Sequence, residues 1–192
     1  MGFLEKLTAA IERNESRLCI GLDPTLEALP DGVEPSAQGM LRFNRDIIEA
    51  TASVACAYKP NTAFYEALGS EGWRVLEETV RAIPADIPVI ADAKRGDIAS
   101  TAEAYARALF DHLGCDACTL SPYLGIDAVT PFLARPGRFV FVLCRTSNPS
   151  AGELQDAPVG DGVLYQRVAE TVRGRLARFA ARLDRSGGPS AS

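Results

Sequence analysis

The sequence predicts an α/β fold built on a parallel sheet. Short runs of β-branched and other apolar residues alternate with longer segments in which apolar residues recur every three or four positions. Nearly every position in these runs is apolar, instead of alternating between apolar and polar, as in strands that helices cover on both faces. Polar residues follow directly after the runs. This order of segments requires right-handed crossovers and gives either an open doubly wound sheet or a (β/α) barrel.

The predicted strands are short and spread along the chain. They cover residues 18–22, 55–58, 88–91, 117–120 and 139–143. Polar side chains stand at or just beyond the C-terminal end of each strand, namely Asp23, Lys59, Asp92, Lys94, Ser121 and residues 145–148. Ligands bind at that edge in both architectures, and contributions from several strand ends favour the barrel.

Two of the predicted helices each carry a continuous apolar stripe. The stripes consist of Trp73, Leu76, Val80 and Ile83 in the first helix, and of Leu164, Val168, Val172, Leu176, Phe179 and Leu183 in the second, which runs from about 163 to 184. The helix after the third strand should stop at Leu113, because Gly114 is suited to a left-handed C-terminal cap.

Length and composition indicate one globular domain. The chain has 192 residues, of which 47% are hydrophobic and 23% charged, and we expect a single barrel domain over 1–184 and a flexible Gly- and Ser-rich tail over 185–192. The net charge of −5 comes without a basic block, so a nucleic-acid partner is not expected. No apolar stretch approaches the ~20 residues that span a bilayer, and no secretory leader is recognisable. We therefore expect a cytoplasmic protein with no membrane partner.

The five cysteines predict buried, reduced thiols rather than disulfides. Cys115 and Cys118 form a C-x-x-C pair, but the pair enters a strand instead of opening a helix, which argues against a redox dithiol. A zinc site would need a further ligand besides His112. We interpret His112, the single histidine, as a polar residue in the last turn of its helix.

The segment from Asp92 to Ile98 carries the clearest chemistry. Strand side chains alternate with period two, so Asp92 and Lys94 should point to the same side, and Asp97 should follow on a turn. This predicts an ammonium group between two carboxylates. Only three lysines stand against 17 arginines, and Lys59 and Lys94 both lie at strand ends, which favours a use for an ammonium that can give up a proton. The alternative is a structural ion pair.

The same segment resembles the motif of the orotidine 5′-phosphate decarboxylase family, in the subgroup that carries Asp-Ala-Lys-Arg-Gly-Asp-Ile. Further stretches agree with the family in the expected order, namely 21–24, 58–61 with 63–66, 121–125 and 144–149. Together the motifs extend over nearly the whole chain.

The resemblance implies a (β/α)8 TIM barrel that converts orotidine 5′-phosphate to UMP and CO2 in pyrimidine biosynthesis, with neither a metal nor an organic cofactor. Lys94 would be the catalytic proton donor to C6 of the pyrimidine, and Asp92 would lie against the departing carboxylate. Without a cofactor to accept the electron pair, such a site must stabilise the carbanion electrostatically.

The resemblance also implies a homodimer with shared sites. Asp97 and Thr101 would reach across the interface into the partner's site, where Asp97 acts as a catalytic residue near the ribose. Asp23 and Lys59 would hold ribose hydroxyls, and Ser147 would contact the pyrimidine. Ser147 lies in the segment 145–162, which we expect to be a structureless lid, with a surface insertion as the alternative.

Two other hypotheses remain open at this point. The first is a metal-dependent sugar-phosphate lyase of the same superfamily, although Lys59 stands where such enzymes place an acidic ligand, and its charge would repel a divalent metal. The second arises because about five strands are recognisable, whereas an eight-strand barrel typically takes ~250 residues. We therefore expect an incomplete barrel that lacks the last three βα units and their phosphate-binding loops. Such a chain is either a shortened enzyme or a catalytically impaired remnant or assembly partner of one.

Overall fold

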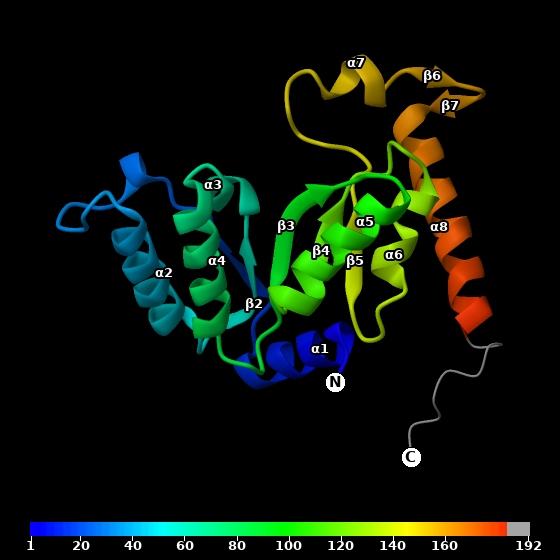
Figure 1. The fold of residues 1–192 in the computed structure, drawn as a ribbon. Coiled ribbons are helices and arrows are strands. Elements are labelled where there is room, and N and C mark those ends of the chain that lie inside the picture. Colours follow the sequence, from blue (N-terminus) through cyan, green and yellow to red (C-terminus); the bar gives the residue numbers. More distant parts are fainter. Residues whose placement is uncertain (184–192) are drawn as a thin grey trace.

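The computed structural model describes residues 1–183 and contains five parallel strands in chain order. These are β1 (Leu18–Leu22), β2 (Ala55–Pro60), β3 (Ile90–Arg95), β4 (Ala117–Leu120) and β5 (Phe139–Val142). β1 pairs with β2, and β3, β4 and β5 pair in sequence. Parallel bridges from Tyr58 to Val89 and from Asn61 to Asp92 connect β2 to β3. The five strands therefore follow one another as in part of a (β/α) barrel, which confirms the predicted fold class (Figure 1).

Helices connect and cover the strands (Figure 1). They are α1 (Phe3–Asn14), α2 (Ala37–Thr51), α3 (Thr62–Glu66), α4 (Gly69–Ala82), α5 (Ala99–Ala106), α6 (Thr130–Leu133), α7 (Ala151–Gln155) and α8 (Leu164–Leu183). Short 3-10 turns span Leu26–Ala28 and Ile126–Ala128, and α5 continues as a π-helical segment over Arg107–His112. Gly114 has φ +80, as expected for the residue that ends this helix.

The main core lies between the strands and helices α2 to α6. Its largest fully buried side chains include Tyr58, Tyr65, Phe110, Phe132, Met40 and Leu41. A second cluster lies below the sheet, where Phe3 and neighbouring apolar residues of α1 pack on Ile90 and Ala117. Helix α1 thus covers the N-terminal ends of the strands, whereas their C-terminal ends remain available for a site.

Three strands differ in extent from the prediction, and the smallest difference is at β5, which ends at Val142 instead of at residue 143. β2 continues through Lys59 to Pro60, and β3 begins at Ile90 and continues to Arg95. Pro88 has no N–H to donate, and the N–H of Val89 donates to the Asp116 carboxylate at 2.9 Å instead of to a neighbouring strand. Regular pairing with β4 therefore starts at Ile90, two residues after the predicted start of the strand.

The expected burial on both faces is correct for the inner strands and wrong for β1 and β5. In the described part of the chain each of these pairs with one strand only. As a result Leu18 and Phe141 are 49% and 40% exposed. Cys19 on β1 is exposed for the same reason, and Cys144 is half-buried, so the prediction of buried thiols is correct for Cys56, Cys115 and Cys118 only.

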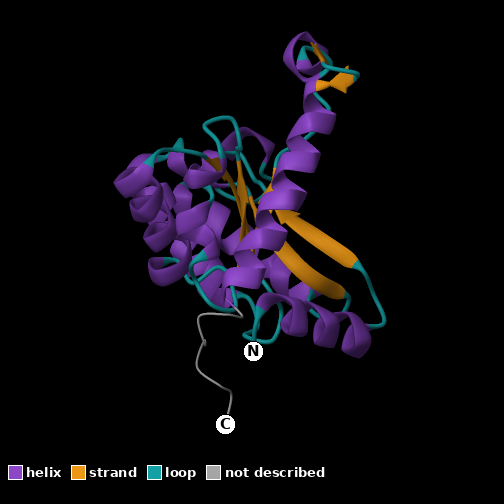
Figure 2. Ribbon diagram, turned by 90° about the vertical axis from the view of Figure 1, so that its right-hand side faces the viewer, coloured by secondary structure: helices purple, strands orange, loops and turns teal. Residues whose placement is uncertain are grey.

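The segment 145–162 is not structureless, which corrects the prediction. It contains α7 and the strand β6 (Pro158–Val159), which pairs with β7 (Gly162–Val163) in a short antiparallel hairpin. Figure 2 shows the hairpin at the N-terminal end of α8, beyond the parallel strands.

The tail expected at 185–192 lies outside the described residues. Among the helices of residues 1–183, none combines the length and the apolar character needed to cross a bilayer.

Candidate active site

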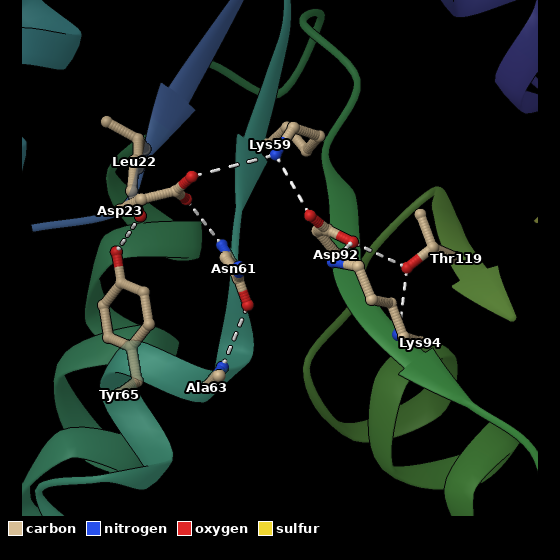
Figure 3. Close-up of polar contacts among 9 residues, drawn as sticks. All are labelled: Leu22, Asp23, Lys59, Asn61, Ala63, Tyr65, Asp92, Lys94 and Thr119. Atoms are coloured by element: carbon tan, nitrogen blue, oxygen red, sulfur yellow. Dashed lines mark hydrogen bonds and ion pairs between the residues drawn. The ribbon is translucent and has the colours of Figure 1, made fainter. Parts of the chain in front are cut away.

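Asp92 lies at the centre of a charged cluster at the C-terminal ends of the strands (Figure 3). Its Oδ1 is 2.6 Å from Nζ of Lys94, and its Oδ2 is 3.2 Å from Nζ of Lys59. The Asp92 side chain is 13% exposed, whereas that of Lys94 is 49% exposed. One carboxylate therefore binds two ammonium groups, and the Lys94 group lies on the open side of the cluster.

This order of charges is the reverse of the prediction. Within one chain Lys94 does not lie between two carboxylates, because Asp97 turns away and its Oδ1 accepts the N–H of Ile98 at 2.7 Å. Burial acts to raise the pKa of the Asp92 carboxyl, but hydrogen bonds from Lys94 and Thr119 and the nearby Lys59 charge outweigh it. The pKa of Asp92 is consequently lower than usual, and the group is an anion at neutral pH.

Lys59 extends the cluster to the end of β1. Its Nζ is 3.8 Å from Oδ2 of Asp23, and Oδ1 of Asp23 accepts the backbone N–H of Asn61 at 2.8 Å. The Asn61 side chain accepts the N–H of Ala63 and so caps α3. The ends of β1, β2 and β3 are thereby fixed to one another by polar contacts.

A buried tyrosine holds the end of β1 from behind. The Tyr65 hydroxyl donates to the carbonyl of Leu22 at 2.8 Å and accepts from Nδ2 of Asn44 at 2.9 Å. Asn44 also donates to Thr79, and all three side chains are buried. Burial raises the pKa of Tyr65, so its hydroxyl remains a donor. This network connects Asp23, the next residue after Leu22, to helices α2 and α4.

Lys94 has a strained backbone. Its φ is +48, a conformation that residues other than glycine seldom adopt, and the pairing of β3 with β4 is irregular between Ala91 and Arg95. At this irregularity the Lys94 N–H donates to Oγ1 of Thr119 at 2.9 Å, and Thr119 in turn donates to Oδ1 of Asp92 at 2.8 Å. Thr119 is not among the site residues predicted from the sequence. Its signal is one polar residue within the apolar run of β4, directly after the Cys118 that pairs with Ala91.

Arg95 and Gly96 fix the turn that follows. The Arg95 guanidinium forms an ion pair with Glu66 and lies 5.1 Å from the centre of the Tyr105 ring. A Cβ on Gly96 would lie 2.8 Å from the carbonyl oxygen of Ser121, so a side chain at Gly96 would force the two strand ends apart. The two residues that follow Lys94 are therefore tightly constrained.

The other predicted site residues lie outside this cluster. Thr101 is exposed on α5, and Ser147 is exposed in the loop after β5. Within residues 1–183 no hydrogen bond or ion pair joins Lys59, Asp92 or Lys94 to Asp97, Thr101 or Ser147. One chain thus brings together Asp23, Lys59, Asp92 and Lys94.

The C-x-x-C pair is structural, as predicted. Cys115 and Cys118 are fully buried, and burial, reinforced by the Asp116 charge, raises the pKa of Cys115 to about 12. His112 forms a contact of 2.9 Å with Glu77 on α4, and this contact lies outside the charged cluster around Asp92. In the part of the chain that the structure covers, no three His, Cys, Asp or Glu side chains gather into a potential metal site.

Comparison with known proteins identifies what the chain is similar to. The model of the orotidine 5′-phosphate decarboxylase / HUMPS family matches residues 16–180. An orotidine 5′-phosphate decarboxylase of Herpetosiphon aurantiacus is 54% identical over 174 residues, which are 90% of this chain and 65% of the relative. One of Thermomicrobium roseum is 55% identical over 175 residues, or 90% of this chain and 62% of the relative.

Solved structures agree. An OMP decarboxylase of Leishmania donovani has a TM-score of 0.79 and 46% identity, covering 88% of this chain and 64% of its own. A structure from Toxoplasma gondii, described as a putative orotidine-monophosphate-decarboxylase, has a TM-score of 0.84 and 44% identity, covering 88% of this chain and 58% of its own. The chain spans less than two thirds of the length of these relatives.

Proposed function

Because the chain belongs to the orotidine 5′-phosphate decarboxylase / HUMPS family, we propose that it converts orotidine 5′-phosphate to UMP and CO2, a step of pyrimidine biosynthesis in the cytoplasm. The observation that carries the proposal is the contact of 2.6 Å between the carboxylate of Asp92 and the ammonium of Lys94 at the end of β3. The pair presents a proton donor on its open side, where a substrate at the strand ends can reach it.

The proposed chemistry uses the protein's own charges. The bond between C6 and the carboxylate breaks, its electron pair stays on C6, and CO2 leaves. A proton then moves from Nζ of Lys94 to C6, and the neutral amine regains a proton from solvent. A fixed ammonium stabilises the developing carbanion without reorganisation during the reaction. The proposal therefore needs no metal or organic cofactor.

Asp92 has two functions in this scheme. Its negative charge holds the Lys94 ammonium at 2.6 Å, and its position places it close to the carboxylate of a bound substrate. Repulsion between the two carboxylates is relieved when CO2 departs, which favours the reaction. Lys59 neutralises the other oxygen of Asp92 at 3.2 Å and, with Asp23, offers a donor and an acceptor to ribose hydroxyls.

Residues outside the cluster complete the proposed site. Asp97 lies just before α5, and Thr101 lies on the exposed face of that helix, which supports a homodimer in which both enter the partner's site. Ser147 lies between β5 and α7, which supports contact with the pyrimidine when the segment 145–162 covers the strand ends. A dimer of this kind has two equivalent sites, each built from both chains.

A metal-dependent sugar-phosphate lyase is less well supported. The Lys59 ammonium lies between the carboxylates of Asp23 and Asp92, at 3.8 and 3.2 Å. A divalent cation bound by these two carboxylates would be repelled by that ammonium. The second alternative, a catalytically impaired remnant or assembly partner, is separated from the proposed enzyme by the same assay of turnover.

The test is an ultraviolet assay of orotidine 5′-phosphate decarboxylation on the purified 192-residue chain, with and without EDTA, beside a sizing column. We expect turnover from a dimer, unaffected by EDTA. Loss of turnover in EDTA would favour the metal-dependent lyase. A folded chain that does not turn over the substrate would contradict the proposal and favour the remnant.

A further inference from the structure

We propose that Thr119 is a positioning residue that sets the geometry of both Asp92 and Lys94. Its hydroxyl is the point at which the β4 strand contacts the side chain of one and the backbone of the other (Figure 3). This inference rests on the proposed function for its kinetic consequence, although its structural part does not. Thr119 touches neither the reacting atoms nor Nζ of Lys94 by a hydrogen bond, and acts through its two neighbours.

The two contacts determine where the hydroxyl proton points. A hydroxyl has one proton to donate and lone pairs that accept. The Lys94 backbone N–H can only donate, so Oγ1 of Thr119 accepts it at 2.9 Å. The hydroxyl proton is then directed to Oδ1 of Asp92 at 2.8 Å. Thr119 therefore favours the ionised form of Asp92 and holds one oxygen at a fixed position.

The contact to Lys94 compensates for a defect in the sheet. Between Ala91 and Arg95 the regular β3–β4 pairing is interrupted, and Lys94 adopts φ +48. A backbone N–H at such a position needs an acceptor in place of the missing strand partner. The Thr119 side chain supplies that acceptor. Strained conformations persist only where the surroundings hold them, so Thr119 helps to keep Lys94 in the conformation from which Nζ reaches Asp92.

Two charged groups contact Asp92, and a third lies behind one of them. Lys94 lies on β3, the same strand as Asp92, and Lys59 lies on β2. Asp23 lies beyond Lys59 at the end of β1. From β4 the contribution is the uncharged Thr119 hydroxyl. Removal of this hydroxyl changes no charge in the cluster. An effect of its removal on Asp92 or Lys94 thus reports orientation and hydrogen bonding rather than lost charge.

The test compares substitutions that differ in the hydroxyl. Thr119→Val removes the hydroxyl and keeps the shape, and Thr119→Ser keeps the hydroxyl. Thr130→Val is the matched control, because it removes an exposed threonine hydroxyl that donates to the carbonyl of Ile126 in the 3-10 turn before α6. Carboxyl-carbon NMR titration of the full chain follows the Asp92 pKa, and steady-state assays give kcat and KM.

We expect the Asp92 pKa to rise in Thr119→Val and to stay near the wild-type value in Thr119→Ser and Thr130→Val. We expect kcat to fall roughly 10- to 100-fold in Thr119→Val with a much smaller change in KM, as for loss of one hydrogen bond to a charged group, and Thr119→Ser should restore most of it.

Unchanged Asp92 titration and kcat in Thr119→Val, or equal losses in the valine and serine variants, would overturn the inference. If Thr119→Val does not fold, the pair Thr119→Ala and Thr119→Ser makes the same comparison. If the wild-type chain lacks turnover, the proposed function fails, while the titration still decides whether Thr119 positions Asp92.

Discussion

At the scale of single residues, the site depends on one carboxylate that binds two ammonium groups. Asp92 keeps Lys59 and Lys94 close to each other, at 3.2 and 2.6 Å from its two oxygens. Without that negative charge the two ammonium groups would repel each other across the ends of β2 and β3. The ionised form of Asp92 therefore contributes both to the geometry of the site and to the stability of the fold.

This dependence predicts a pH-sensitive difference between the wild type and Asp92→Asn. The folded-state pKa of Asp92 is lower than usual, so its ionised form stabilises the fold above its ordinary pKa of about 3.9, and this contribution is lost as pH falls through the lower folded-state value. Urea unfolding should show a more stable wild type at pH 7 and a smaller difference near pH 3. Asp31→Asn, at an exposed turn, is the control. A difference of equal size at both pH values would contradict the interpretation.

At the scale of elements, period and polarity in the sequence are sufficient to predict the parallel strands and most of the helices. β1 and β4 have the predicted bounds; the apolar run of β4 is largely buried in the parallel sheet, whereas β1 lies at its edge and is mostly exposed. The same period places Asp92 and Lys94 together. It does not predict the left-handed Lys94 or the role of Thr119, because both arise from an irregularity between two strands that are distant in sequence. Pairing of this kind has no local signal.

The segment 145–162 shows the same limit. Its Gly and Pro content predicts a loop, but contacts between residues about ten positions apart in the sequence order it around α7. Arg145 binds both oxygens of Asp156 at 3.0 Å, and the Thr146 N–H and hydroxyl bind the amide of Gln155 at 2.8 and 2.7 Å. These contacts fix the strand-side end of the loop that carries Ser147.

We predict that Asp156→Ala loosens this segment without unfolding the protein. The Arg145–Asp156 pair is almost half exposed, so its loss should change the free energy of unfolding by about 1 kcal/mol or less. Amide hydrogen exchange over 145–157 should accelerate, and KM for orotidine 5′-phosphate should rise more than kcat falls. Asp161→Ala, at the turn between β6 and β7, provides a matched control. Unchanged exchange in Asp156→Ala would show that the pair does not order the segment.

At the scale of the whole molecule, the described strands form an open parallel array. Its outer strands carry exposed apolar side chains, with Leu18 at 49% and Phe141 at 40%. Parallel edges of this kind promote association with other chains. Oligomeric state is therefore part of the proposed function, and the proposed dimer places Asp97 and Thr101 of one chain beside Lys94 of the other.

This arrangement predicts that two inactive variants restore activity when mixed. Lys94→Ala and Asp97→Ala each damage both sites of their own dimers. A mixed dimer contains one site with an intact Lys94 and an intact Asp97, so random exchange should recover about a quarter of the wild-type rate. The rate is measured after the variants are unfolded and refolded together, with each variant refolded alone as the control. No gain from mixing in dimers that do exchange would contradict a shared site.

The central claim is that the Lys94 ammonium, held by Asp92, performs the proton transfer. Its most direct test is the rate of decarboxylation of orotidine 5′-phosphate by the folded 192-residue chain and by Lys94→Ala, with folding checked by circular dichroism. We expect Lys94→Ala to fold and to lose at least about 10²- to 10³-fold in kcat, since removal of a pre-organised charge typically raises the barrier by ~3–4 kcal/mol. Comparable turnover by wild type and Lys94→Ala would contradict the claim.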